Sequence, residues 1–286
     1  MLDLASRAWI DLIESTLSAR VYPLDEGFQL TVFRRGPWRI GYLNFVAGCE
    51  ALQPMSIARL RTIAREMGVH ALRVQANEPV SDSLSFARYP LSACRIRDLQ
   101  RWHVRQFDKG RRTENRLSRT ALNLRPAVAG DGAAMHRLYQ STVQRKGGTA
   151  HYTRAYFEAL APLAGYVAEK DGVVVGFVCS ARYGDRGLYL HGAHADSARS
   201  LYASDLLFLR MLEAARAAGL RSFDFLHSPH PSLLRYKQMW GGEAMTDWVS
   251  DLALNWRGTA FAALYSLRHR IRGQRSEPVR DKAEAE

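Results

Sequence analysis

The sequence has few cysteines, few lysines and no long apolar run, and each shortage excludes a class of protein. Cys49, Cys94 and Cys179 lie far apart without a Cys-x-x-Cys pair, so we expect neither a disulfide framework nor a zinc or other metal site. No apolar stretch approaches the roughly 20 residues that cross a bilayer. Residues 1–13 lack the plan of a signal peptide, so a cytoplasmic location is expected.

Lysine is so scarce that arginine carries almost all of the positive charge. The formal charge is +12, from 40 Lys+Arg against 28 Asp+Glu. Only five of these basic residues are lysines: Lys109, Lys146, Lys170, Lys237 and Lys282. The planar guanidinium suits bidentate contacts with phosphate and carboxylate groups, so the bias indicates an anionic partner. Codon usage in a GC-rich genome would produce the same bias.

The basic residues are densest between residues 95 and 125, where ten of them stand against three acidic residues. An amphipathic helix is expected over about 99–120, with Trp102, Phe107 and Leu117 among its apolar positions. The charge excess predicts that this segment borders a cleft between two halves of the protein and grips a phosphate-bearing substrate. A solvated helix face is the alternative.

The second half of the chain has the clearest pattern of strands and helices. Asp171 and Gly172 favour a tight turn between two strands, over 166–169 and 173–181. Apolar residues at helical spacing then predict a helix that ends at Gly219. The other expected elements are strands over 188–193, 222–226 and 248–254 and a short helix over about 231–240.

The first half repeats a reduced version of this plan. A hairpin is expected over 30–45, followed by a helix closed by Gly68 and a strand over 69–74. Aligning Gly68 with Gly219 places the two units 151 residues apart, each with a hairpin, a helix, a glycine and a strand in that order. This order favours an α+β protein with an internal duplication.

An ordered set of motifs resembles the GNAT acyltransferases, and more closely their FemAB-like or BioF2-like branch. The matching runs are Arg111-Arg112-Thr113-Glu114-Asn115-Arg116, Leu188-Tyr189-Leu190-His191-Gly192-Ala193, Phe223-Asp224-Phe225 and Tyr236-Lys237-Gln238-Met239-Trp240-Gly241-Gly242. The resemblance implies two GNAT-like domains in tandem. These would be a degenerate domain over 1–125, an acyltransferase domain over 126–258, and a basic C-terminal helix and tail over 259–286 that could touch a membrane surface weakly.

The same resemblance implies transfer of an acyl or aminoacyl group to an amine, from aminoacyl-tRNA or acyl-coenzyme A and without a tightly bound cofactor. In the coenzyme A branch, a glycine-containing loop offers backbone amides to the pyrophosphate at a helix N-terminus. The corresponding stretch here is 199–204, with Tyr202 and Ser204 at the glycine positions and Asp205 directly after it. These changes make coenzyme A a less favoured donor. Ser204 or Asp205 would also serve as a helix N-cap.

Four residues are candidates for catalysis. Lys237 is the first, because the family's matching lysine lies at the transfer cleft, where an ammonium could hold the donor's carbonyl oxygen. Its replacement by alanine would then reduce turnover far more than stability. Asp224 would pair with a cation, either structurally or catalytically. His191 or His227 could take the proton of the attacking amine.

The candidate substrate-binding residues are mostly basic or aromatic. They are Arg111, Arg112, Arg116, Tyr139, Arg199, Tyr202, Ser204, Tyr236 and Trp240. Trp240 would exclude water if it lined the cleft. Two further functions stay open at this point. One is a catalytically inactive GNAT-fold protein that binds nucleic acid or another polyanion, and the other is a coenzyme A-dependent acetyltransferase for a small amine.

Overall fold

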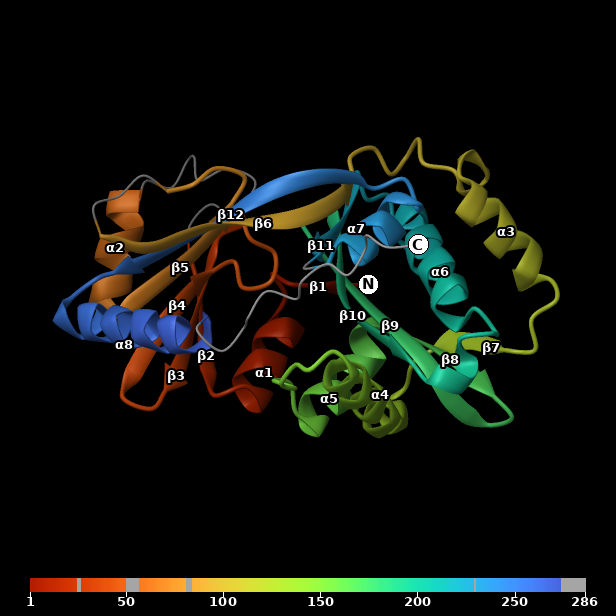
Figure 1. Cartoon of the computed structure of the whole chain (residues 1–286), viewed down its shortest axis with the longest axis horizontal. Helices are drawn as coiled ribbons and strands as arrows, with labels where there is room; N and C mark the ends of the chain where they lie inside the picture. The colour runs from red at the N-terminus through yellow and green to blue at the C-terminus, as the bar shows by residue number, and fades with distance from the viewer. Residues whose placement is uncertain (25–26, 50–56, 81–83, 229, 274–286) are drawn as a thin grey trace, which may run out of the picture.

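All the strands belong to one continuous mixed sheet, with helices packed on both faces (Figure 1). The computed structural model describes residues 1–24, 27–49, 57–80, 84–228 and 230–273. In spatial order the strands are β2 (Ala19–Pro23), β3 (Gln29–Arg35), β4 (Trp38–Leu43), β5 (Ala71–Ala76), β12 (Glu243–Ala253), β6 (Ser85–Ile96), β11 (Ser222–His227), β10 (Arg186–His194), β9 (Val173–Tyr183), β8 (Gly165–Lys170) and β7 (Asn123–Pro126). A further short strand, β1 (Leu2–Asp3), pairs with β9. The predicted α+β class is confirmed.

The helices in chain order are α1 (Arg7–Thr16), α2 (Ile57–Glu66), α3 (Asp108–Leu117), α4 (Gly132–Arg145), α5 (Arg154–Ala164), α6 (Ala203–Ala217), α7 (Pro231–Gln238) and α8 (Trp256–Gly273). In the C-terminal half, α5 and α6 pack on opposite faces of the sheet. Alternation along β9 shows this, because Phe177 and Cys179 belong to the core under α5 and Val178 to the core under α6. No described helix is long and apolar enough to cross a membrane.

The repeat expected from the sequence is present in the structure. The β3–β4 hairpin, α2, Gly68 and β5 correspond in order to the β9–β10 hairpin, α6, Gly219 and β11. Both glycines have positive φ, +67° and +77°, which the left-handed end of a helix requires. In each half the strand after the glycine pairs in parallel with the second strand of the hairpin.

The two halves exchange strands at the centre of the sheet. β12 comes after the C-terminal half in sequence, yet it pairs with β5 of the N-terminal half along its residues 248–253. β6 comes after the N-terminal half, yet it pairs with β11. β6 and β12 also pair with each other along most of their length, forming the long ribbon at the top of Figure 1. The halves are therefore joined by backbone hydrogen bonds as well as by side chains.

The basic segment differs from its prediction. The helix expected over 99–120 is confined to α3, and a loop with a short 3-10 turn precedes it. Trp102 is an apolar residue of the expected helix, but it packs in the core from this loop and donates through Nε1 to the Trp240 carbonyl oxygen at 2.8 Å. α3 packs on α6 at the outer end of the molecule (Figure 1). Only the start of the segment borders the junction of the two halves, where Arg95 pairs with Asp224 of β11 and Arg97 with Glu243 of β12.

Candidate functional site

A cavity of about 670 Å³ opens where two parallel strands separate. β10 and β11 are paired only over residues 186–188 and 222–224. Beyond this point each strand has a register irregularity against its other neighbour, at Tyr189–His191 in β10 and at Asp224–His227 in β11. These irregularities bend the strands and turn side chains out of the regular alternation. The separated parts of the two strands form the floor of the cavity.

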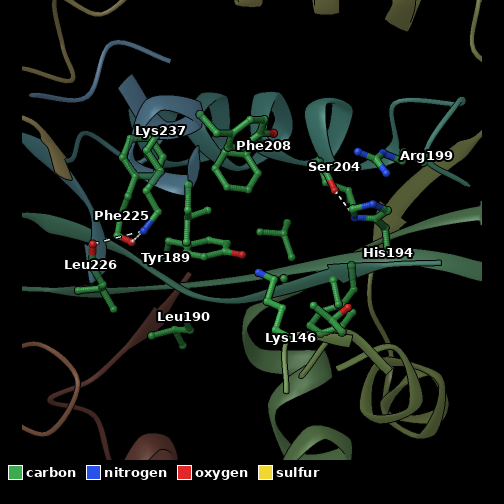
Figure 2. Close-up of a pocket in the computed structure, with 18 of the residues that line it drawn as sticks. Lys146, Tyr189, Leu190, His194, Arg199, Ser204, Phe208, Phe225, Leu226 and Lys237 are labelled. Atoms are coloured by element: carbon green, nitrogen blue, oxygen red, sulfur yellow. Dashed lines mark hydrogen bonds between the residues drawn. The ribbon is translucent and has the colours of Figure 1, made fainter. Parts of the chain in front are cut away.

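The cavity has an apolar floor and a basic rim (Figure 2). The floor is lined by Tyr189, Phe225 and Leu226, and Phe208 of α6 faces them from the opposite side. The rim is formed by Arg145 and Lys146 at the end of α4, by His194 at the end of β10, and by Arg199 before α6. Arg145 is paired with Asp196, whereas Lys146 and Arg199 have no carboxylate partner in the described part of the chain. The site thus suits a ligand with one apolar and one anionic part.

Lys237 of α7 lines the cavity, but its ammonium group is directed at protein oxygens. Nζ donates to the carbonyl oxygens of Phe225 at 2.7 Å and His227 at 3.0 Å, and to Ser228 Oγ at 2.9 Å. The side chain is 1% exposed, and burial lowers the pKa of Lys237 to about 8. Between these acceptors the backbone of Leu226 has φ +58°, an uncommon conformation for a branched residue. Lys237 therefore holds the bend of β11 in place.

The rim meets the first turn of α6. Ser204 Oγ lies 2.7 Å from His194 Nδ1, and both residues face the cavity (Figure 2). The N-terminus of a helix carries partial positive charge, which adds to that of Lys146 and Arg199. Burial, together with the charges of Arg145 and Arg199, lowers the pKa of His194. The rim is thus a cluster of positive groups around a helix N-terminus.

The fold agrees with comparisons to known proteins. Residues 105–238 match the family model described as an acetyltransferase (GNAT) domain. FemX has the same fold, with a TM-score of 0.65 and 13% identity over 92% of this chain and 94% of that chain.

Two other solved structures share the fold over nearly the whole chain. The C-terminal domain of a protein named as a lysylphosphatidylglycerol synthetase, from Agrobacterium fabrum, has a TM-score of 0.59 and 13% identity, over 92% of this chain and 91% of that chain. L-PGS from Bacillus licheniformis has a TM-score of 0.58 and 12% identity, over 97% of this chain and 99% of that chain. No curated protein matches the sequence. The fold expected from the resemblance to the GNAT acyltransferases is thereby confirmed.

The Asp205 side chain does not line the cavity. Its carboxylate accepts from Lys109 Nζ at 2.6 Å and from the Tyr236 hydroxyl at 2.9 Å, with Arg116 at 3.8 Å. These groups bind and neutralise the carboxylate, so Asp205 does not by itself exclude a phosphate-bearing ligand at the start of α6. Tyr202, in contrast, does stand at the start of α6, with φ +56° and the Arg116 guanidinium 3.4 Å from its ring centroid.

The two candidate histidines lie on different sides of the sheet. His227 lines the cavity, with Nδ1 3.1 Å from the Ser92 carbonyl oxygen. Since a carbonyl only accepts, Nδ1 carries the proton and Nε2 has the free lone pair. Burial lowers the pKa of His227, so the ring is neutral at pH 7 and able to accept a proton.

His191 does not line the cavity, so its placement there was wrong. The irregularity of β10 turns the side chain to the opposite face, where Tyr139, Tyr152, Tyr156 and Phe157 surround it. His191 Nε2 lies 3.0 Å from the Tyr156 hydroxyl, and burial lowers the pKa of His191 to about 4. Tyr139, a predicted substrate-binding residue, belongs to this aromatic cluster and also lies outside the cavity.

Asp224 is part of a buried ion network behind the cavity floor. Its Oδ2 accepts from Arg95 Nη2 at 2.7 Å and lies 3.5 Å from Arg186, and its Oδ1 accepts from the Leu226 N–H at 2.7 Å. The carboxylate is 2% exposed and does not line the cavity. Of the two roles considered for Asp224, the structural ion pair is the one observed. It fixes the same bend that Lys237 holds.

The remaining predicted residues divide by location. Those that line the cavity are Arg199, Ser204 and Tyr236, and those that do not are Arg111, Arg112, Arg116, Tyr202 and Trp240. Arg111 and Arg112 are exposed on α3, and Trp240 is fully buried in the core, 6.1 Å from the Phe208 ring. The charge density and the family resemblance predicted the three arginines as cleft residues, whereas they lie on α3, which packs on the outer side of α6.

Sequence reasoning missed the part of the rim that comes from α4. Lys146 and Arg145 come from the end of this helix, and His194 from the end of a strand. The scarcity of lysine was a signal for Lys146 that went unused, since only five lysines occur in the chain. No group of three or more histidine, cysteine or acidic side chains in the described ranges could hold a metal ion.

Proposed function

We propose that the protein is an N-acyltransferase that binds a phosphate-bearing acyl donor in the cavity between β10 and β11. The observation that carries this proposal is the cavity's basic rim beside its apolar floor, in a part of the chain that matches the GNAT family model. Lys146 and Arg199, both without a carboxylate partner in the described ranges, would bind phosphate groups at the positive N-terminus of α6. The acyl group would lie over the apolar floor.

The donor we favour is an aminoacyl ester of tRNA. A compact pyrophosphate loop needs small residues directly before α6, and here the loop ends in Tyr202, whose ring is stacked with the Arg116 guanidinium. The names of two structural neighbours also refer to a lysyl-lipid synthetase and to FemX rather than to acetyl transfer. Acyl-coenzyme A is the alternative donor, and the neutralised Asp205 removes one objection to it.

The proposed reaction is direct attack of a neutral amine on the carbonyl carbon of the donor. A carbon–nitrogen bond forms and the ester carbon–oxygen bond breaks, so the donor leaves as a free hydroxyl. His227 Nε2 accepts the proton from the amine and returns it to the leaving oxygen. The oxyanion is stabilised by a backbone N–H at Leu190, which has no partner residue on β9. Proximity of the two substrates supplies much of the rate.

Lys237 is assigned the role of a positioning residue, because its protons are given to oxygens of β11 and Ser228. In Lys237→Met the free energy of unfolding should fall by about 2 kcal/mol, since buried carbonyl groups lose their donor. Turnover should fall with it, because the bend of β11 forms the floor. Urea unfolding and transfer kinetics measure the two effects. Lost turnover at unchanged stability would instead show that the ammonium acts directly on the substrate.

The donor assignment is tested by a transfer assay with labelled aminoacyl-tRNA and labelled acetyl-coenzyme A, against a panel of amines. We expect transfer from the tRNA ester. The double variant Lys146→Gln/Arg199→Gln should raise KM for the donor by about tenfold or more, since each cation makes a charge-assisted contact. Arg111→Gln, an equally conservative change outside the cavity, should leave KM unchanged. Transfer from acetyl-coenzyme A alone would reverse the donor assignment.

The second candidate function is binding of a polyanion without catalysis, which the satisfied ammonium of Lys237 favours. It predicts that tRNA binds with a steep dependence on salt concentration and that neither donor is consumed. Binding of uncharged tRNA with no transfer from either donor would support this function and exclude the acyltransferase.

A further inference from the structure

A second cavity, of about 760 Å³, lies in the N-terminal half of the protein. It is formed by the end of α1 and the start of β2, the tip of the β3–β4 hairpin, the glycine turn after α2, and the start of α8. In Figure 1 these elements lie at the left and left of centre, whereas α6, whose residues line the first cavity (the GNAT cavity), lies at the right. The two cavities share no lining residue.

The charge of this cavity is strongly positive. Four arginines line it, Arg20, Arg34, Arg39 and Arg257, against a single acid, Glu14. Glu14 is already engaged, because its Oε2 accepts from Arg20 at 3.3 Å and its Oε1 from the Val21 N–H at 2.9 Å. In the described part of the chain, Arg34, Arg39 and Arg257 have no carboxylate partner. Three guanidinium groups therefore face one cavity without a counter-charge.

Arg39 is half-buried and Arg34 and Arg257 are exposed, whereas two half-buried arginines elsewhere in the described chain have carboxylate partners. Arg73 is paired with Asp251 at 2.7 Å, and Arg125 with Asp131 at 2.6 Å. Placing like charges together without a partner costs free energy, which a bound anion would recover. The cluster is therefore a better candidate for a binding site than for a structural feature.

His70 adds a neutral donor to the wall. Its Nδ1 accepts from the Arg39 N–H at 3.2 Å, so in the neutral ring the proton lies on Nε2. Burial and the charges of Arg257 and Arg39 lower the pKa of His70, which keeps the imidazole neutral at pH 7.

Gly68 leaves the space that Arg39 occupies. Its φ is +67°, and a Cβ built there would stand 3.2 Å from Arg39 Nη1. Trp256 directly precedes Arg257 in the chain. Its side chain is 74% exposed, and the Arg257 guanidinium lies 5.2 Å from its ring centroid. An exposed indole beside an arginine offers a flat apolar contact next to the anion site.

We propose that this second cavity binds the phosphate group of an organic phosphomonoester. Three guanidinium groups match the double charge of a phosphomonoester and its several acceptor oxygens better than the single charge of a carboxylate. The volume is within the range of small-molecule sites and leaves room for the organic part beside Trp256. The phosphate could belong to a soluble metabolite or to a lipid headgroup. The proposal does not depend on acyl transfer.

The test is binding of two phosphomonoester probes to the full chain. Glycerol 3-phosphate is titrated by calorimetry, with glycerol as the neutral control, and vesicles of phosphatidylcholine with or without phosphatidic acid are used in a sedimentation assay. We expect Arg39→Gln/Arg257→Gln to weaken binding by about tenfold or more, because two charge-assisted contacts are lost. Arg35→Gln, on the same hairpin but outside the cavity, and Arg199→Gln, in the GNAT cavity, should bind as the wild type does.

Each outcome of the two binding assays either supports or overturns the proposed phosphomonoester site. Binding of glycerol 3-phosphate that requires Arg39 and Arg257 supports the site and a soluble ligand. Binding confined to vesicles with phosphatidic acid, with the same requirement, supports the site and a lipid ligand. The proposal is overturned if the wild type binds neither probe. It is also overturned if the double variant binds as tightly as the wild type, or if Arg199→Gln loses binding equally.

Discussion

His191 shows how burial sets the chemistry of a single side chain. The aromatic rings around it lower its pKa to about 4, so the imidazole stays neutral in the folded protein over the physiological range. In the unfolded chain the same group takes up a proton near its usual pKa of about 6.5. Between these two values the unfolded state binds more protons than the folded state. Stability contributed by His191 is therefore present above pH 6.5 and lost as the pH falls towards 4.

His191→Gln should make the protein less sensitive to acid. Between pH 7.5 and pH 5, His191 accounts for a loss of about 2 kcal/mol in the free energy of unfolding. Glutamine does not titrate and can still contact the Tyr156 hydroxyl. Urea unfolding at the two pH values separates this effect from any change in packing, which would appear equally at both. An unchanged difference between the two pH values in the variant would refute the assignment.

At the scale of elements, the turn between α7 and β12 sets how the loop before α3 docks. Gly241 has φ +88°, and a Cβ there would stand 2.4 Å from the Phe107 ring. The neighbouring Trp240 carbonyl accepts from Trp102 at 2.8 Å. The aromatic residues of the loop therefore pack directly on the backbone of the turn. This close approach needs a glycine for two reasons, the backbone conformation and the space.

Gly241→Ala should be more destabilising than Gly172→Ala. Both glycines have positive φ, +88° and +78°, so both variants lose about 1 kcal/mol for the backbone conformation. At Gly172 nothing lies within 4 Å of the added Cβ, whereas at Gly241 the Phe107 ring must move. Overpacking of this kind costs a further 1–3 kcal/mol, roughly. Thermal or urea unfolding of the two variants measures the difference, and equal losses would contradict it.

At the scale of the whole molecule, strand exchange makes the two halves depend on each other. β6 lies between β11 and β12, and β12 lies between β5 and β6. If the N-terminal half unfolded alone, β11 would lose its antiparallel neighbour and expose the core beneath α6 and α7. If the C-terminal half unfolded alone, β5 would lose β12. Neither half retains a complete sheet without the other.

Unfolding should therefore occur as one cooperative transition. The tryptophans are spread over both halves, from Trp9 and Trp38 to Trp240 and Trp256, so fluorescence reports on the whole chain. Fluorescence and far-ultraviolet circular dichroism should give the same midpoint in urea. Two separated transitions, or midpoints that differ between the probes, would show that the halves unfold independently despite the shared sheet.

The local elements could be read from the sequence because their signals lie in short stretches of chain. Asp171-Gly172 turns the β8–β9 hairpin, Gly219 ends the helix before β11, and β11 follows at the predicted place. The basic helix was predicted too long, because Trp102 fits a helical pattern but is used in the core from a loop. Apolar periodicity reports which residues are buried, and the partner that buries them lies far away in the sequence.

The sequence by itself determined the α+β class and the repeated order of elements. It also predicted five site residues that line one cavity: Lys237, His227, Arg199, Ser204 and Tyr236. The tertiary structure alone decided that β6 and β12 change places between the halves, and that His191 turns away from the cavity. It also decided which arginines remain without a counter-charge. The reason is physical: turns and helix ends depend on neighbouring residues, whereas strand pairing, bends and charge partners depend on residues that only folding brings together.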